Sequence, residues 1–227
     1  LYKQTQLQDT FGVNMVALIN GQPKLCNLRE LIDVFLQHRR EVVTRRTVFN
    51  LRKARDRGHV LEGLAVALAN IDEFIRIIRE SPTPPVAKAE LMARSWDSPL
   101  VREMLTRARD DGSTISADDY RPEGLERAYG LQPDGLYRLS DTQAQEILQM
   151  RLQRLTGLEQ DKIIAEYRDV MAQIEDLLDI LARPERVSTI ITDELTALKN
   201  EFGQSRVGAR RSTIEHNAQE LETEDLI

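Results

Sequence analysis

The sequence predicts a mainly α-helical protein: a long antiparallel coiled-coil arm, a small helical head domain at its tip, and a short β hairpin or strand region at its base. Two stretches predict the arm, because residues 27–80 contain no proline and a second amphipathic stretch begins at Leu158. A turn-rich segment between them predicts the head. Two long helices joined by a compact insert must run back past each other, which predicts antiparallel pairing.

The first expected element is a β hairpin. Residues 13–19 are mostly apolar and strand-forming, and the Asn20-Gly21 pair that follows is a turn signal. Residues 23–26 would then return as the second strand. Because an isolated two-stranded hairpin is marginal in water, residues 1–27 are expected to belong to a larger domain.

One long helix is expected over residues 28–81. Asn27 is a suitable N-cap with Glu30 at the third helical position, which is a capping-box arrangement. The prolines from Pro82 onward end the helix because they remove backbone donors. Gly58 is either a hinge or a cost of about 1 kcal/mol relative to alanine.

The second half of this helix carries a coiled-coil seam with alternating spacings of three and four. Its members are Leu61, Leu64, Leu68, Ile71, Ile75 and Ile78. Extended backwards, the same register reaches Arg57, Ala54, Asn50, Thr47 and Val43, which is a poor seam. The packed face is therefore expected to shift toward Val42, Phe49 and Val60.

The segment after the prolines predicts short helices and a loop. Helices are expected over residues 86–94 and 98–109, the second with Ser98 as its cap. Residues 110–136 are rich in Asp, Gly, Ser and Pro and predict a surface loop, and their acidic pairs lack the spacing of a calcium loop. A further amphipathic helix is expected over residues 143–155, with a cap at Ser140.

The return path consists of two more helices. The helix from Leu158 carries its own seam of Ile163, Tyr167, Val170, Ile174, Leu177 and Leu181. Pro184 marks a kink or boundary before a helix over residues 185–201, and residues 205–227 are expected to be a strand or an extended tail.

Composition excludes several classes of protein. The single cysteine excludes a disulfide framework, and the three scattered histidines predict no metal site. The chain has no eighteen-residue apolar run and no signal peptide, so it is expected to be intracellular and to have no membrane partner. Since it begins at Leu1 rather than methionine, it is expected to be a piece of a longer protein.

The net charge of −6 conceals a basic segment. Residues 37–57 hold eight arginines and lysines against Glu41 and Asp56. Such a segment either faces a polyanion or forms a solvated helix surface paired with acids on a neighbouring helix. The sequence leaves both interpretations open.

Four stretches resemble the family formed by the A subunits of DNA gyrase, a type IIA topoisomerase. They are FGVNMVAL (11–18), HRREVVTRRT (38–47), LEGLAVALANID (61–72) and QAQEILQMRLQRLTGLE (143–159). The resemblance covers nearly the whole chain in order. The LTGLE ending and the RREVVTRR run favour gyrase over the A subunit of topoisomerase IV, which remains an alternative alongside a non-enzymatic coiled-coil scaffold.

The resemblance implies a domain organisation. Residues 1–27 would end a tower domain, residues 28–81 would form the outgoing arm helix, and residues 82–157 would form a dimerisation head. Residues 158–203 would return along the arm, and residues 204–227 would lead back to the tower and on to a C-terminal domain. Paired heads form the exit gate through which a transported DNA duplex leaves.

The resemblance also implies the activity and the partners. The family introduces negative supercoils by ATP-dependent double-strand passage, as an A2B2 complex with the gyrase B subunit in the bacterial cytoplasm, associated with the nucleoid. Its catalytic tyrosine lies upstream, and Mg²⁺ and ATP bind the partner subunit. This segment is therefore expected to hold no catalytic residue, cofactor or metal, and to be inactive alone. The chain's tyrosines are expected in packing or interfaces: Tyr2, Tyr120, Tyr129, Tyr137 and Tyr167.

Two sets of residues are candidate sites. The face expected to pair with a second head, called the predicted gate face below, consists of Ile147, Leu148, Met150, Arg151, Leu152 and Leu155. The alternative is that this face packs only within its own head. The residues expected to face DNA are Arg39, Arg40, Arg45, Arg46 and Arg52.

Overall fold

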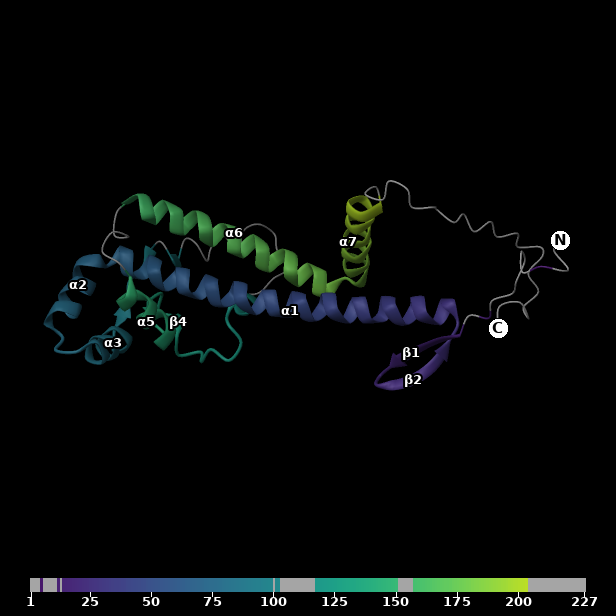
Figure 1. The fold of residues 1–227 in the computed structure, drawn as a ribbon. Helices are drawn as coiled ribbons and strands as arrows, with labels where there is room; N and C mark the ends of the chain where they lie inside the picture. The colour runs from purple at the N-terminus through teal and green to yellow at the C-terminus, as the bar shows by residue number, and fades with distance from the viewer. Residues whose placement is uncertain are drawn as a thin grey trace. The chain divides into compact units, whose positions relative to one another are not determined.

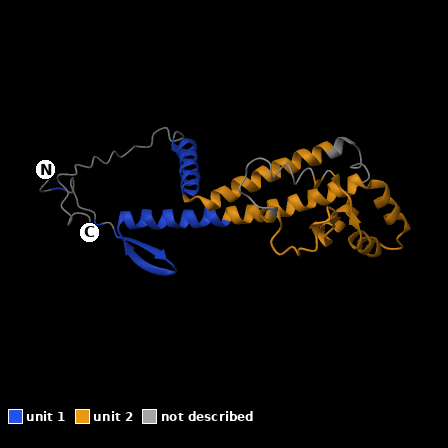
Figure 2. Cartoon of the chain, turned by 180° about the vertical axis from the view of Figure 1, so that it is seen from behind, with its two compact units in different colours: residues 1–45, 185–227 blue, residues 46–184 orange. Residues whose placement is uncertain are grey.

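The computed structural model describes residues 5, 12, 14–99, 101–102, 117–150 and 157–203. The chain divides into two compact units, unit 1 (Leu1–Arg45 with Glu185–Ile227) and unit 2 (Arg46–Pro184), coloured separately in Figure 2. In the parts described, the fold is mainly helical with small antiparallel sheets, as predicted.

Unit 1 begins with the predicted hairpin. Strand β1 (Met15–Ile19) pairs antiparallel with β2 (Gln22–Cys26), so that Ile19 lies opposite Gln22. The two turn residues, Asn20 and Gly21, both have positive φ, at 52° and 80°. Such a two-residue turn matches the twist of the flanking strands, and the hairpin prediction is confirmed.

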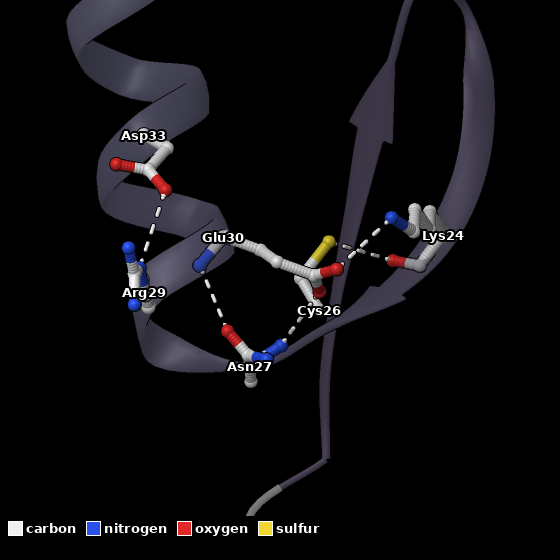
Figure 3. Close-up of polar contacts among 6 residues, drawn as sticks. All are labelled: Lys24, Cys26, Asn27, Arg29, Glu30 and Asp33. Atoms are coloured by element: carbon white, nitrogen blue, oxygen red, sulfur yellow. Dashed lines mark hydrogen bonds and ion pairs between the residues drawn. The ribbon is translucent and has the colours of Figure 1, made fainter.

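A capping box joins the hairpin to the long helix (Figure 3). The Glu30 backbone N–H donates to Asn27 Oδ1 at 2.8 Å, and the Asn27 N–H donates to Glu30 Oε2 at 3.1 Å. The Lys24 ammonium lies 3.1 Å from Glu30 Oε1 and, as the largest cause, lowers the pKa of Glu30. The predicted start of the helix is therefore confirmed.

The long helix is not continuous to residue 80. Helix α1 (Leu28–Ala69) ends at a turn, and α2 (Ile71–Glu80) follows. The break falls at Asn70, whose φ and ψ are −123° and 31°. Its side-chain nitrogen donates to the carbonyl oxygens of Val66 at 3.0 Å and Asp97 at 2.8 Å. An asparagine that bonds nearby backbone in this way competes with helix continuation.

The break corrects the predicted seam. Leu61, Leu64 and Leu68 are buried as expected, but after Asn70 the buried positions are Phe74 and Ile77. The predicted members Ile71 and Ile75 are half-buried and Ile78 is exposed. The turn at Asn70 resets which side of the helix faces the core.

The expected shift of the packed face toward Val42, Phe49 and Val60 is confirmed only in part, because Val60 packs half-buried against the core and Val42 is half-buried. Within unit 2, Thr47 and Ala54 stay buried on the original register, and Leu51 joins them. Phe49, on the proposed alternative stripe, is 55% exposed. On the same register, Asn50 is half-buried and Arg57 is exposed.

The head consists of short elements after the prolines. Helix α3 (Pro84–Ala93) matches the expected helix, and Ser98 Oγ accepts from the Val101 N–H at 3.3 Å as a cap. Then come a 3₁₀ helix (Ala117–Tyr120) and a three-stranded antiparallel sheet with the order β3 (Ser95–Trp96), β5 (Tyr137–Arg138), β4 (Gly130–Leu131). This sheet was not predicted, because two-residue strands show no alternation.

Helix α5 (Asp141–Gln149) is shorter than the helix predicted over residues 143–155. The residue after it, Met150, has φ −66° and ψ 130° and so leaves helical geometry. The predicted cap is confirmed as a full capping box between Ser140 and Gln143. Residues 151–155 lie outside the described part of the chain.

Helix α6 (Gly157–Ala182) returns along the second half of α1 in the antiparallel direction (Figure 1). Arg57 Nε donates to Glu166 Oε1 at 2.7 Å, and a Cβ at Gly58 would lie 3.6 Å from Val170. The predicted seam of α6 is buried at Ile163, Tyr167, Val170, Ile174 and Leu177. The coiled-coil pairing is therefore confirmed.

The core of unit 2 joins the arm helices to the head. Its members come from α1, α2, α3, β3, β5, α5 and α6, and they include Trp96, which is 2% exposed. The rings of Trp96 and Phe74 stack with centroids 4.2 Å apart. In unit 1, helix α7 (Pro184–Gly203) begins at the predicted proline boundary.

Candidate functional site

A buried polar cluster lies where the head meets the arm helices. Its centre is Gln143, on the first turn of α5 and 0% exposed. The Gln143 Nε2 group donates to Tyr137 Oη at 2.7 Å and to the His59 carbonyl oxygen at 2.6 Å. His59 Nε2 lies 2.7 Å from Ser140 Oγ. These bonds connect α1 to β5 and α5.

The cluster continues through the half-buried carboxylate of Glu62 to α6. The Tyr137 hydroxyl donates to Glu62 Oε2 at 2.7 Å, and the Tyr167 hydroxyl donates to Glu62 Oε1 at 3.1 Å. Each oxygen of Glu62 therefore has one tyrosine partner, from β5 and from α6. Segments far apart in sequence meet at one side chain of the outgoing helix.

Burial sets the protonation of these groups. Desolvation lowers the pKa of His59 to about 4, and the charge of Arg121 contributes to that shift. Desolvation also raises the pKa of Glu62, although the two tyrosine hydroxyls and Arg121 oppose the shift. The pKa values of Tyr137 and Tyr167 are raised by burial and by the Glu62 carboxylate. The arrangement keeps His59 and both tyrosines neutral at physiological pH, which suits them to hold geometry rather than to transfer protons.

The predicted gate face is placed only in part. Ile147 is 4% exposed in the core of its own unit, while Leu148 and Met150 are half-buried against that core. Arg151, Leu152 and Leu155 lie outside the described residues. Ile147 therefore packs within its own head, and the pairing role of the remaining residues stays a prediction.

The arginines predicted to face DNA differ in their surroundings. Arg39 forms an ion pair with Glu194, Arg45 lies 3.6 Å from Glu41, and Arg52 Nε donates to Glu123 at 2.9 Å. Arg40 and Arg46 are exposed. Contact between these arginines and DNA stays a prediction.

Ion pairs to other elements continue along the basic segment. The Arg55 guanidinium donates to the Asp119 carbonyl oxygen at 2.6 Å and lies 3.7 Å from Glu123. Arg57 pairs with Glu166 on α6. Much of the basic charge between Arg52 and Arg57 is thus compensated within unit 2. This favours the interpretation of this part of the segment as a helix surface paired with acids over one that faces a polyanion.

The tyrosines expected in packing are buried or half-buried where the structure describes them. Tyr120, Tyr137 and Tyr167 are buried and Tyr129 is half-buried, while Tyr2 lies outside the described residues.

Within the described ranges, no group of His, Cys, Asp and Glu side chains is arranged to hold a metal ion. Over the same ranges, no helix combines the length and apolarity needed to cross a membrane.

No expectation drawn from the sequence singled out the polar cluster. His59 entered only as one of the scattered histidines, and Glu62 lies beside the predicted seam rather than on it. One signal was present in the sequence. Glu62 interrupts an apolar run from Val60 to Ala69 at a position next to the buried Leu61.

Comparison with known proteins places the chain in a family. The family model for the A subunit of DNA gyrase/topoisomerase IV matches residues 1–196. Over all 227 residues, the chain is 54% identical to the DNA gyrase A subunit of Aeromonas salmonicida, and 52% identical to those of Pseudomonas aeruginosa and Escherichia coli. It spans 23–25% of the length of these relatives. With the family model matching most of its residues, the chain belongs to the family of DNA gyrase/topoisomerase IV A subunits.

Proposed function

We propose that this chain is the arm-and-head segment of a DNA gyrase A subunit, and that its head pairs with the head of a second copy to form the exit gate. The observation that carries the proposal is identity of 52–54% over the full chain to proteins named as the A subunit of DNA gyrase. The fold supports it, because α1 and α6 form an antiparallel pair joined by α2, α3, α5 and a small sheet.

The parent protein would be a type IIA topoisomerase working in the bacterial cytoplasm. It would introduce negative supercoils by ATP-dependent double-strand passage as an A2B2 complex with the gyrase B subunit. The catalytic tyrosine would lie elsewhere in the same polypeptide, and ATP and Mg²⁺ would bind the partner subunit, so this segment alone would be inactive. The A subunit of topoisomerase IV is the alternative within the family, and an ATP-dependent supercoiling assay on relaxed DNA separates the two.

The gate is tested by light scattering of this chain over a dilution series. A mass near twice 26.0 kDa is expected, because the two heads would form an isologous interface. Leu148→Asp and Leu152→Asp are expected to weaken the dimer, since each places a charge in that interface. A monomer at every concentration, or a dimer dissociation constant unchanged by both variants, would show that the predicted gate face does not pair the two heads.

The basic segment of α1 is proposed to contact the transported duplex. Phosphate contacts by the arginines predicted to face DNA would be salt-dependent, and Arg39, Arg45 and Arg52 would first have to leave their carboxylate partners. Charge reversal at Arg40 and Arg45 is expected to slow strand passage at unchanged DNA cleavage. Arg29→Glu is the matched control, because Arg29 lies on the same helix outside this segment and its side chain is 91% exposed. Equal supercoiling rates for the variants and the wild type would show that these arginines form a solvated surface and do not contact the duplex.

A further inference from the structure

The start of α5 is fixed to the arm by the same side chain that begins the helix. Gln143 Oε1 accepts from the Ser140 N–H at 3.0 Å and closes the capping box. Its Nε2 group donates to Tyr137 and to the His59 carbonyl oxygen. A capping box needs only the first of these contacts, so the others serve the attachment of α5 to α1.

The backbones also approach closely at this point. A Cβ built at Gly63 would lie 2.8 Å from Cβ of Gln143. The first turn of α5 is therefore pressed against α1, with Tyr137 and Glu62 bonded beside the contact. Helix α5 is held at its N-terminal end by both close packing and directional bonds.

Stability alone does not account for a half-buried carboxylate, bonded to two tyrosines, at this place. Taking Glu62 out of water is costly, and apolar replacements of buried charged groups are often neutral or stabilising. What a fully bonded polar cluster supplies is one defined geometry, because its hydrogen bonds are directional. The cluster is thus better suited to orient α5 than to strengthen the core.

The orientation of α5 matters at its other end. The helix has 9 residues, so it is about 13 Å long. A tilt of about 10° at Gln143 would move the far end by about 2 Å, whereas binding surfaces need their groups held to about 0.5 Å. Leu148 and Met150, at that end, belong to the predicted gate face.

We propose that Gln143 is a positioning residue for the exit gate. Held by His59 and by Tyr137, which is itself bonded to Glu62, it sets the tilt of α5. It thereby aligns Leu148 and Met150, the described residues at the far end of this helix, with the head of the second copy. This inference rests on the proposed function, since it requires the heads to pair.

A matched pair of variants tests the inference. Tyr137→Phe and Tyr167→Phe each remove one hydroxyl from the same Glu62 carboxylate, but only Tyr137 also accepts from Gln143. The measurement is the rate of subunit exchange between full-length proteins that carry donor and acceptor fluorophores, with the thermal unfolding midpoint measured in parallel. Tyr137→Phe is expected to speed exchange about tenfold, because Gln143 loses the acceptor that orients α5 and the heads pair less tightly; tenfold corresponds to about 1.4 kcal/mol of pairing free energy. Tyr167→Phe is expected to lower the unfolding midpoint similarly and to change exchange less than about twofold.

Equal exchange rates for the two tyrosine variants would overturn the inference, because the cluster would then act through stability alone. Leu152→Asp separates this failure from failure of the gate itself. If Leu152→Asp leaves exchange unchanged, the heads do not hold the two copies together and both proposals fail. If it speeds exchange while the tyrosine variants behave alike, only the positioning role of Gln143 is lost.

Discussion

The core of unit 2 and the hairpin of unit 1 differ in how much of their apolar side chains they expose. In unit 2, Leu61, Phe74 and Leu91 are at most 1% exposed. In the hairpin of unit 1, Val16 and Leu25 are register partners and remain 67% and 63% exposed. The stability of the described chain is therefore expected to reside in unit 2, and equal substitutions in the two units should have unequal costs.

The largest difference is expected for leucines. Leu61→Ala should lower the free energy of unfolding of unit 2 by about 2–5 kcal/mol, because it leaves a cavity in a close-packed core. Leu18→Ala should change stability by less than about 0.5 kcal/mol, since Leu18 is 74% exposed. Denaturant unfolding followed by fluorescence of Trp96, the single tryptophan of the chain and a core residue of unit 2, measures Leu61→Ala. Circular dichroism followed through the same denaturant series also covers unit 1 and measures Leu18→Ala. Equal shifts of the midpoint would contradict the comparison.

The pH dependence that follows from His59 belongs to unit 2. The folded chain does not protonate His59 until the pH falls to about 4, whereas the unfolded chain takes up this proton near 6.5. Stability is therefore lost as the pH falls through this window, by about 3 kcal/mol at 1.4 kcal/mol per pKa unit. Unfolding free energies from pH 7 to 4, read at Trp96, should show this slope, and His59→Gln should flatten it.

Glu62 contributes with the opposite sign. Its pKa is raised by burial, so its stabilising contribution is complete below its ordinary pKa of 4.5 and is lost as the pH rises through its folded value. Glu62→Gln should remove this opposing slope and make the loss on acidification steeper. A Glu62→Gln profile parallel to the wild type would show that this carboxylate does not change its protonation on folding.

The sequence predicted the features that depend on neighbouring residues. The hairpin turn at Asn20-Gly21, the capping box at Asn27, the cap at Ser140 and the boundary at Pro184 are all local, and all are confirmed. The break at Asn70 was missed, because it depends partly on a bond to the carbonyl oxygen of Asp97, 27 positions away.

The polar cluster could not be predicted for the same reason. Glu62 takes its partners from β5 and α6, 75 and 105 positions along the chain. Its helical spacing alone is typical of a solvated position. Residue type alone does not decide burial along α1, because Thr47 and Ala54 are buried although Thr47 is polar and Ala54 is small.

The two capping residues give the finest comparison, since each starts a helix but in a different unit. Asn27→Ala should cost unit 1 about 1 kcal/mol, the usual loss for an N-cap. Ser140 is 4% exposed and its hydroxyl also bonds to His59, so Ser140→Ala should cost unit 2 about 2 kcal/mol, because a buried partner is left unsatisfied as well. Trp96 fluorescence should report the Ser140→Ala loss and not the Asn27→Ala loss, which should appear only in the helical circular dichroism signal. If Asn27→Ala shifts the Trp96 transition as much as Ser140→Ala does, the two units unfold together, and the stability assigned to unit 2 belongs to the whole described chain.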